Sequence, residues 1–246
     1  MNKKPVYYKQ SDRRWSGKPY RVPGETSTIG SAGCGPSCAA MVIASLKDKS
    51  VTPETTCAWS VAHGYKALKQ GTYYSYFKPQ MAAYGIECEQ LLSGRILNQP
   101  DHPVHGRVQE YLRQGDWIIA LMGPGTWTKG GHFVLVWDWD SKVRILDPAS
   151  SASDRLNGDP GAFRREVRCY WRVNARDHNK EDDMTGEEIY NALNGYFSKQ
   201  PVPVWAKKEL EEAVKLGITD GKEPMALIPR YQAAIMAKRA AEKISR

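Results

Sequence analysis

The order of the hydrophobic segments constrains the fold of this chain most. An apolar, helix-like segment runs from Gly33 to Leu46, and β-rich runs bounded by Gly, Pro and Asp follow much later, at residues 117–122, 132–137, 142–146 and 166–171. Helices that come first and strands that come later are typical of an α+β fold. We expect an N-terminal helix packed on an antiparallel sheet, with residues 137–141 turning one strand into the next.

A charged stretch divides the chain. Residues 174–184 are dense in charge and hold no aliphatic or aromatic residue apart from Ala175 and Met184, as in a solvated linker. The sequence therefore predicts a large first domain over residues 1–173, a linker over 174–184 and a small second domain over 185–246.

The second domain has the pattern of three short helices. Thr185–Glu188 matches a capping box and opens a helix to about Ser198. The stretch Trp205–Leu216 predicts a second helix, with Gly217 suited to a left-handed C-cap. A third helix is expected from about Pro229. The residues expected to face inward are Ala206, Leu210, Ala213 and Val214 on the second helix, and Tyr231, Ala234 and Ile235 on the third.

The net charge of +8 lies wholly on the first part of the chain. Residues 1–173 hold 23 Lys and Arg against 15 Asp and Glu, whereas residues 174–246 hold 12 of each. A basic surface attracts anionic polymers. Nucleic acid and an acidic cell wall both satisfy this condition, and charge alone does not choose between them.

The sequence carries information on membrane insertion, export and the redox state of the cysteines. No apolar run approaches the roughly 20 residues of a membrane helix, and residues 1–15 lack the apolar stretch of a signal peptide. We expect no integral membrane segment and synthesis in the cytoplasm without an export signal. The five cysteines are odd in number and include no C-x-x-C pair, which favours reduced thiols over a disulfide framework or a zinc ribbon.

Cys34 has the sequence setting of a nucleophile. Gly33 and Gly35 allow close approach of backbone and substrate, and Pro36 is compatible only with the first turn of the helix that follows. The unpaired amides and the dipole at a helix N-terminus favour the thiolate. A buried inert thiol is the alternative, and it suits Cys38, one turn further on.

His132 and Asp147 complete a candidate triad with Cys34. His132 follows two glycines at the start of a β-rich run, and Asp147 ends the next run. If the two strands form a hairpin, both residues lie at the same end of it. Asp147 can then orient the imidazole that activates the thiol. Taken singly, the histidine also fits a core position and the aspartate a turn.

Two further clusters have metal-ligand character. His102 and His105 have a His-x-x-His spacing, but no third ligand is obvious and Pro103 favours a loop. Asp138 and Asp140 could bind calcium, yet alternating Trp and Asp is explained by a solvated hairpin tip. We expect no metal and no cofactor.

Four motifs follow one another in the first 150 residues. They are Gln-x-Asp-x-x-Trp at 10–15, Gly-Cys-Gly-Pro-Ser at 33–37, Gly-Gly-His-Phe-Val-Leu-Val at 130–136 and Ile-Leu-Asp-Pro-Ala at 145–149. Over about residues 6–150 the chain thus resembles the bacteriocin-processing (double-glycine peptidase-like) type of papain-like cysteine peptidase and its stand-alone relatives. The resemblance implies that Gln10 is the oxyanion donor, beside the nucleophile Cys34, the base His132 and the orienting Asp147.

The stretch Trp205–Gly221 resembles modules of the S-layer-homology type that follow catalytic domains in bacterial and phage cell-wall lysins. Both resemblances imply a peptidoglycan-degrading, endolysin-like endopeptidase or amidase that forms a thioester. Its partner would be wall peptidoglycan or a peptide, with no nucleic acid, and it would reach the wall after lysis or holin-dependent release. No membrane or ATPase segment occurs, which argues against a transporter-coupled role.

Two alternative functions stay open. The same fold suits a cysteine protease that acts on an intracellular protein or peptide, and it suits a binding protein without activity.

Overall fold

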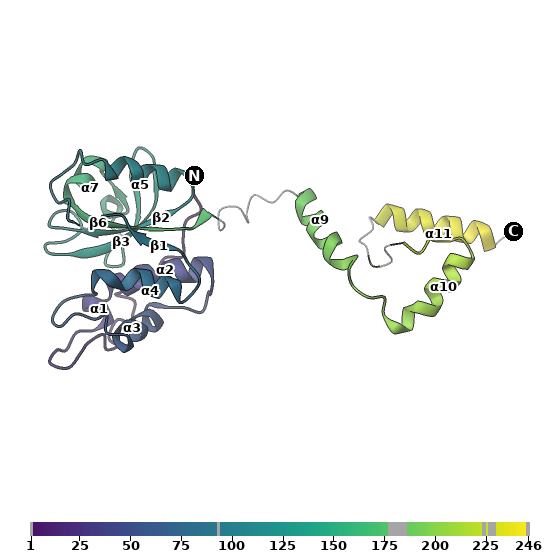
Figure 1. Cartoon of the computed structure of the whole chain (residues 1–246), viewed down its shortest axis with the longest axis horizontal. Helices are drawn as coiled ribbons and strands as arrows, with labels where there is room; N and C mark the ends of the chain where they lie inside the picture. The colour runs from purple at the N-terminus through teal and green to yellow at the C-terminus, as the bar shows by residue number, and fades with distance from the viewer. Residues whose placement is uncertain (1, 93, 177–185, 223–224, 226–229, 245–246) are drawn as a thin grey trace. The chain divides into compact units, whose positions relative to one another are not determined.

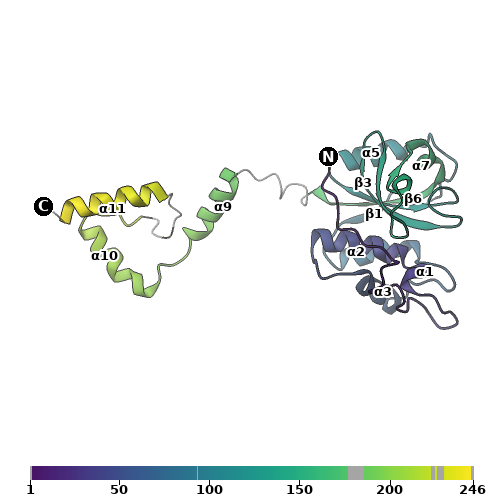
Figure 2. The same cartoon turned by 180° about the vertical axis from the view of Figure 1, so that it is seen from behind.

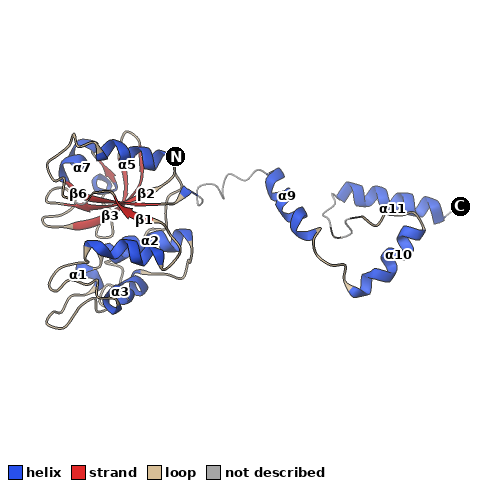
Figure 3. Cartoon of the chain, viewed as in Figure 1, coloured by secondary structure: helices blue, strands red, loops and turns tan. Residues whose placement is uncertain are grey.

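The chain divides into two compact units, residues 1–182 and 183–246. The computed structural model describes residues 2–92, 94–176, 186–222, 225 and 230–244. The first unit combines helices with a sheet, and the described part of the second is built of helices (Figure 3). The first unit therefore has the α+β architecture that the sequence predicts.

A six-stranded antiparallel sheet lies at the centre of the first unit. The strand order is β1-β6-β2-β3-β4-β5, and each neighbouring pair is antiparallel. The strands are β1 (Cys88–Gln90), β2 (Trp117–Met122), β3 (His132–Trp139), β4 (Val143–Leu146), β5 (Asn157–Gly158) and β6 (Val167–Val173). Every residue of β2 is buried, because both faces of the sheet are covered.

Helices cover the two faces of this sheet (Figures 1 and 2). On one face lie α1 (Ile29–Ala32), α2 (Cys34–Leu46), α3 (Pro53–Ala62) and α4 (Phe77–Ala82), preceded by the 3-10 turn η1 (Tyr74–Tyr76). On the other lie α5 (Val104–Arg113) and α7 (Pro160–Glu166), while α6 (Ser153–Leu156) leads into β5. Side chains alternate along β2: Ile119 and Leu121 belong to the core under α2, and Ile118 and Ala120 to the core under α5.

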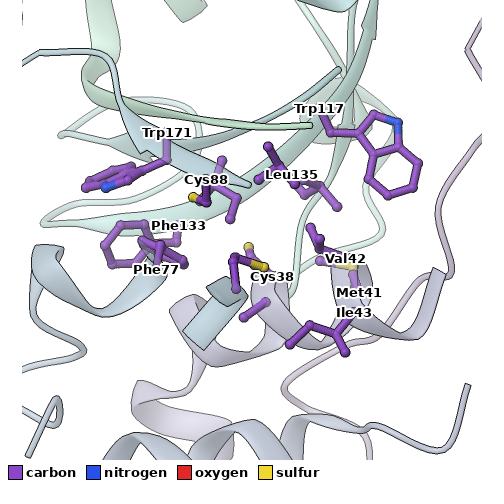
Figure 4. Packing of buried hydrophobic residues seen from close by; sticks show 14 of the residues in the cluster. Cys38, Met41, Val42, Ile43, Phe77, Cys88, Trp117, Phe133, Leu135 and Trp171 are labelled. Carbon is purple, nitrogen blue, oxygen red and sulfur yellow. The ribbon is translucent and has the colours of Figure 1, made fainter. Parts of the chain in front are cut away.

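Helix α2 is the central element of the first core. Every residue from Cys34 to Ala44 is buried, because the sheet covers one side of the helix and α3 and α4 cover others. Figure 4 shows Cys38 and Val42 of α2 near Phe133 and Leu135 of β3. Burial of each such side chain stabilises the fold by roughly 1.5–3 kcal/mol for the larger aliphatic and aromatic residues. The start of α2 is therefore firmly placed against the sheet.

Strands β3 and β4 form the hairpin that the triad hypothesis requires. Leu135 pairs with Leu146 and Val136 with Ile145. Because the strands are antiparallel, the first residue of β3 and the residue after β4 lie at the same end. Those residues are His132 and Asp147.

Several elements differ from the sequence prediction. β3 continues to Trp139, which is buried, so the turn is shorter than the expected 137–141. Pro103 lies in a turn, as expected, but it is the residue directly before α5, so His105 already belongs to a helix. Helices α3 and α4 were not predicted, since their apolar faces are short.

The first unit continues past the expected start of the linker. The backbone N–H of Asn174 donates to the Glu87 carbonyl at 3.0 Å, and Ala175 is buried. Arg172 and Arg176 both bind the carboxylate of Asp116, which has no exposed surface, with their Nε atoms 2.7 and 3.0 Å from it. This Asp116 clasp fixes the chain up to residue 176.

The second unit has three helices among its described residues: α9 (Gly186–Phe197), α10 (Lys207–Lys215), preceded by the 3-10 turn η2 (Val204–Ala206), and α11 (Arg230–Ile244). Gly217, with φ 66°, closes α10 as predicted, and Ile218 N donates to Ala213 O at 2.9 Å. Thr185 and Pro229, expected at two helix starts, lie outside the described residues, as does the side chain of Tyr231.

The expected inward faces of the second unit are not buried. α10 buries none of its residues, and Ala234 and Ile235 of α11 are exposed. On α10 the expected Leu210 and Ala213 are half-buried while the other residues, Val214 included, are exposed, so the predicted face is only partly covered. Amphipathic spacing does not by itself supply a neighbouring surface. Within the part of the chain that the structure describes, no helix has the length and apolar character needed to cross a membrane.

Candidate active site

Cys34 is the first residue of α2, directly after the N-cap Gly33. The two flanking glycines are required by close contacts. A Cβ atom on Gly33 would lie 2.6 Å from the Ile29 carbonyl oxygen, and one on Gly35 would lie 3.0 Å from Thr72 Oγ1. The Gly-Cys-Gly sequence therefore allows the thiol to sit at a tightly packed helix start.

His132 and Asp147 are hydrogen-bonded to each other at the end of the β3–β4 hairpin. Nε2 of His132 donates to Asp147 Oδ1 at 2.7 Å, and both side chains are buried. With Nε2 engaged in this way, Nδ1 is the ring nitrogen left for the thiol.

The thiol of Cys34 meets His132 and two backbone amides. Burial by itself raises the pKa of this thiol, but the hydrogen bond from His132, the imidazolium charge and the N–H groups of Phe133 and Gly35 outweigh burial and lower the pKa. Burial lowers the pKa of His132, whereas its hydrogen bonds to Asp147 and Cys34 raise it to about 9. The arrangement favours a thiolate–imidazolium pair.

Asp147 is held by more than the imidazole. Its Oδ1 also accepts from the Ala149 backbone N–H at 2.8 Å. Its Oδ2 accepts from Arg155 Nε at 2.7 Å. The Arg155 guanidinium also donates to the Trp127 carbonyl at 2.7 Å. Arg155 was not predicted from the sequence, because nothing in the local pattern marks an arginine eight positions after the aspartate.

Tyr7 is a second residue that the sequence did not reveal. Its hydroxyl lies 2.6 Å from two backbone carbonyl oxygens, those of Asp147 and Ser150. Burial and the Asp147 charge raise the pKa of Tyr7 to about 12, so the hydroxyl stays protonated at neutral pH. It ties the N-terminal segment to the turn that carries Asp147.

Gln10 lies beside the triad, between α1 and the segment after Asp147. Its backbone N–H donates to the Pro148 carbonyl, and its Nε2 to the Gly30 carbonyl, each at 2.8 Å. The buried Oε1 atom has no hydrogen-bond partner. One Nε2 hydrogen is therefore used within the fold, and no protein acceptor for the other is found among the described residues.

Comparison of this sequence with protein-family models and with curated proteins finds no match.

The other candidate residues have local partners. His105 is buried, and its ring nitrogens lie 2.9 Å from the Gln99 carbonyl and 3.0 Å from the Tyr170 hydroxyl. His102 Nδ1 accepts from the Val104 N–H at 3.2 Å. No group of three His, Cys, Asp or Glu among the described residues is arranged to hold a metal ion.

Cys38, Asp138 and Asp140 are also accounted for by packing or by partners within the fold. Cys38 is buried in the core, and burial raises the pKa of its thiol well above the usual value. Asp138 Oδ1 accepts from the Trp139 N–H, and Asp140 pairs with Arg144. These contacts account for all three side chains.

Proposed function

We propose that this chain is a cysteine hydrolase of papain-like fold that cleaves a peptide or amide bond in peptidoglycan through a thioester. The observation that carries the proposal is the hydrogen-bonded series Cys34–His132–Asp147 at the N-terminus of α2. A lowered thiol pKa, a raised imidazole pKa and a buried orienting carboxylate are what nucleophilic catalysis by cysteine needs.

In the first half-reaction the Cys34 thiolate attacks the carbonyl carbon of the scissile bond. The resulting oxyanion is stabilised by the Cys34 backbone N–H at the helix start and by the remaining Nε2 hydrogen of Gln10. The His132 imidazolium gives its proton to the leaving amine as the C–N bond breaks. The products of this step are a free amine and an acyl thioester on Cys34.

In the second half-reaction water hydrolyses the thioester. Neutral His132 accepts a proton from the attacking water, and the new oxyanion forms in the same place. Collapse of this intermediate breaks the C–S bond, releases the carboxylic acid and regenerates the thiolate–imidazolium pair. Asp147 keeps Nδ1 directed at the sulfur and stabilises the imidazolium throughout.

The choice of substrate rests on charge and on sequence resemblance. Residues 1–173 hold the whole net charge of +8, which favours binding to an anionic wall polymer. The resemblance of Trp205–Gly221 to wall-binding modules points to the same substrate. We infer that the second unit anchors the protein on the wall and that the first unit cuts it.

The test compares the protein with Cys34→Ser on purified Gram-positive walls, and it uses Cys38→Ala as a matched cysteine control. Turbidity and released amines follow the reaction, and mass spectrometry of the soluble products identifies the bond. We expect lysis by the wild type and Cys38→Ala and none by Cys34→Ser. Intact walls alongside cleavage of soluble peptides would favour the intracellular protease instead. Inertness toward both would favour a binding protein.

A further inference from the structure

The candidate triad carries a buried charge that its own members do not balance. In the ionised state the Cys34 thiolate and the His132 imidazolium neutralise each other. The Asp147 carboxylate, which has no exposed surface, then leaves one negative charge in the cluster without a counter-charge. A buried ion without a counter-ion is costly, and a buried carboxyl group usually becomes neutral instead. The site therefore needs a cation beside Asp147.

The polar groups around the triad are neutral at physiological pH. Burial raises the pKa of Tyr7 to about 12 and the pKa values of Tyr20, Cys38 and Cys57 well above their usual range. None of these groups supplies the required charge.

Two charged residues on neighbouring segments have other partners. Lys9 Nζ donates to Ser151 Oγ at 2.9 Å, at the surface. Asp154 is exposed and accepts from the Arg155 backbone N–H at 3.0 Å. Neither one neutralises Asp147.

Arg155 has both the charge and the geometry for this role. Its Nε and Nη2 atoms lie 2.7 and 2.5 Å from Asp147 Oδ2, on the carboxylate oxygen that His132 leaves unused. Nη2 also donates to the Trp127 carbonyl, and the Trp127 indole N–H donates back to the Arg155 carbonyl at 3.0 Å. Trp127 is buried, so this two-way contact holds the guanidinium in place.

We propose that Arg155 is a positioning residue of the hydrolase: it neutralises the buried charge of Asp147, holds Oδ1 turned to His132, and so sets the pH range in which the Cys34 thiolate forms. The inference rests on the proposed cysteine-hydrolase function. Because a nearby cation disfavours protonation of every group in the cluster, loss of Arg155 makes the thiolate form only at higher pH.

The test measures the rate at which iodoacetamide alkylates Cys34 as a function of pH, with mass spectrometry to locate the label. Arg155→Gln removes the charge. Arg144→Gln is the matched control, since Arg144 of β4 pairs with the partly exposed Asp140. We expect the midpoint of the alkylation profile to rise by about 1–2 pH units in Arg155→Gln and to stay unchanged in Arg144→Gln. A folded Arg155→Gln protein with the wild-type midpoint would overturn the proposal.

Arg155→Lys provides an independent test that does not depend on the folding of the neutral variant. Lysine keeps the charge but lacks the planar fork that reaches Asp147 and Trp127 together. We expect a midpoint close to the wild type with slower hydrolysis, and a midpoint raised by about one unit or more would contradict the proposal.

The same profiles separate the two hypotheses. Wild-type Cys34 that reacts only like an ordinary thiol, with a pKa of about 8.5, would refute the proposed function itself. Early reaction of the wild type together with an unshifted Arg155→Gln profile would refute only the role of Arg155.

Discussion

His132 Nε2 lies 2.7 Å from Asp147 Oδ1, and the carboxylate is completely enclosed. This contact fixes which ring nitrogen faces the sulfur, because a ring that turned over would lose the bond to Asp147. Together with the hydrogen bond to Cys34, it outweighs burial and raises the pKa of His132 to about 9. The orientation of the His132 ring is thus set by the end of the β3–β4 hairpin.

Asp147→Asn is expected to reduce hydrolysis by about 10²–10⁴-fold, because the imidazole loses its orientation and its electrostatic partner. Since Asp147 raises the pKa of His132, its neutralisation moves the alkaline limb of the pH–rate profile to lower pH. Initial rates across the pH range check both effects. Asp138→Asn on the same hairpin is the control, and an equal loss in that variant would contradict the assigned role.

Gln10→Ala is expected to lower the turnover number by about 10²–10³-fold through loss of an oxyanion donor. Alkylation of Cys34 by iodoacetamide forms no oxyanion, so its rate and pH dependence are expected to stay those of the wild type. Parallel measurement of turnover and alkylation separates the two steps. If alkylation slows as much as hydrolysis, Gln10 acts by holding α1 and the Asp147 segment together.

Gly33→Ala is expected to destabilise the first unit by about 1–3 kcal/mol, because its Cβ would lie 2.6 Å from the Ile29 carbonyl oxygen. The matched control is Gly106→Ala in α5, where a Cβ meets nothing within 4 Å. That change is expected to be neutral or to stabilise by up to about 1 kcal/mol. Urea unfolding of both variants checks the difference, and equal midpoints would show that the α1–α2 turn relaxes freely.

Glu25→Gln is expected to weaken the fold at neutral pH by leaving Lys66 without its anion in a site where the Lys66 side chain has 0% exposure. The Lys66 hydrogen bond is the largest cause that lowers the pKa of Glu25 from 4.5 to about 2. A carboxyl group whose pKa is lower in the folded than in the unfolded state stabilises the fold at pH values above the unfolded-state pKa. This contribution is lost as the pH falls from about 4.5 to 2.

Urea midpoints of wild type and Glu25→Gln should therefore converge within that acidic window. Glu54→Gln serves as the control, since Glu54 and its partner Lys18 are both about half exposed and such pairs contribute little. A gap between wild type and Glu25→Gln that stays constant down to pH 2 would disprove the linkage.

The sequence predicted the elements whose local chemistry is decisive. Pro36 and the glycines around Cys34 placed a helix start, and the run 117–122 coincides with β2. A strand was also predicted to end just before Asp147, as β4 does. Each of these features depends on residues that are neighbours in the sequence.

The partners of the site were not predictable in this way. Arg155 reaches Asp147 from α6, eight positions further on, and Tyr7 reaches it from 140 positions earlier. The first contact depends on how the chain turns after β4 and the second on packing of a distant segment, and no spacing rule predicts either. The amphipathic pattern of α10 and α11 likewise gave helices correctly but overestimated burial, because periodicity describes a face and not its surroundings.

The Asp116 clasp bears on how the first unit can be isolated. A fragment that ends at Val173, the last residue of β6, would discard Arg176 and leave the enclosed carboxylate with Arg172 alone. A fragment that ends after Arg176 keeps both guanidinium groups. Protease trimming or gene design that respects this boundary should give an isolated unit that is more stable than one cut at the end of the last strand.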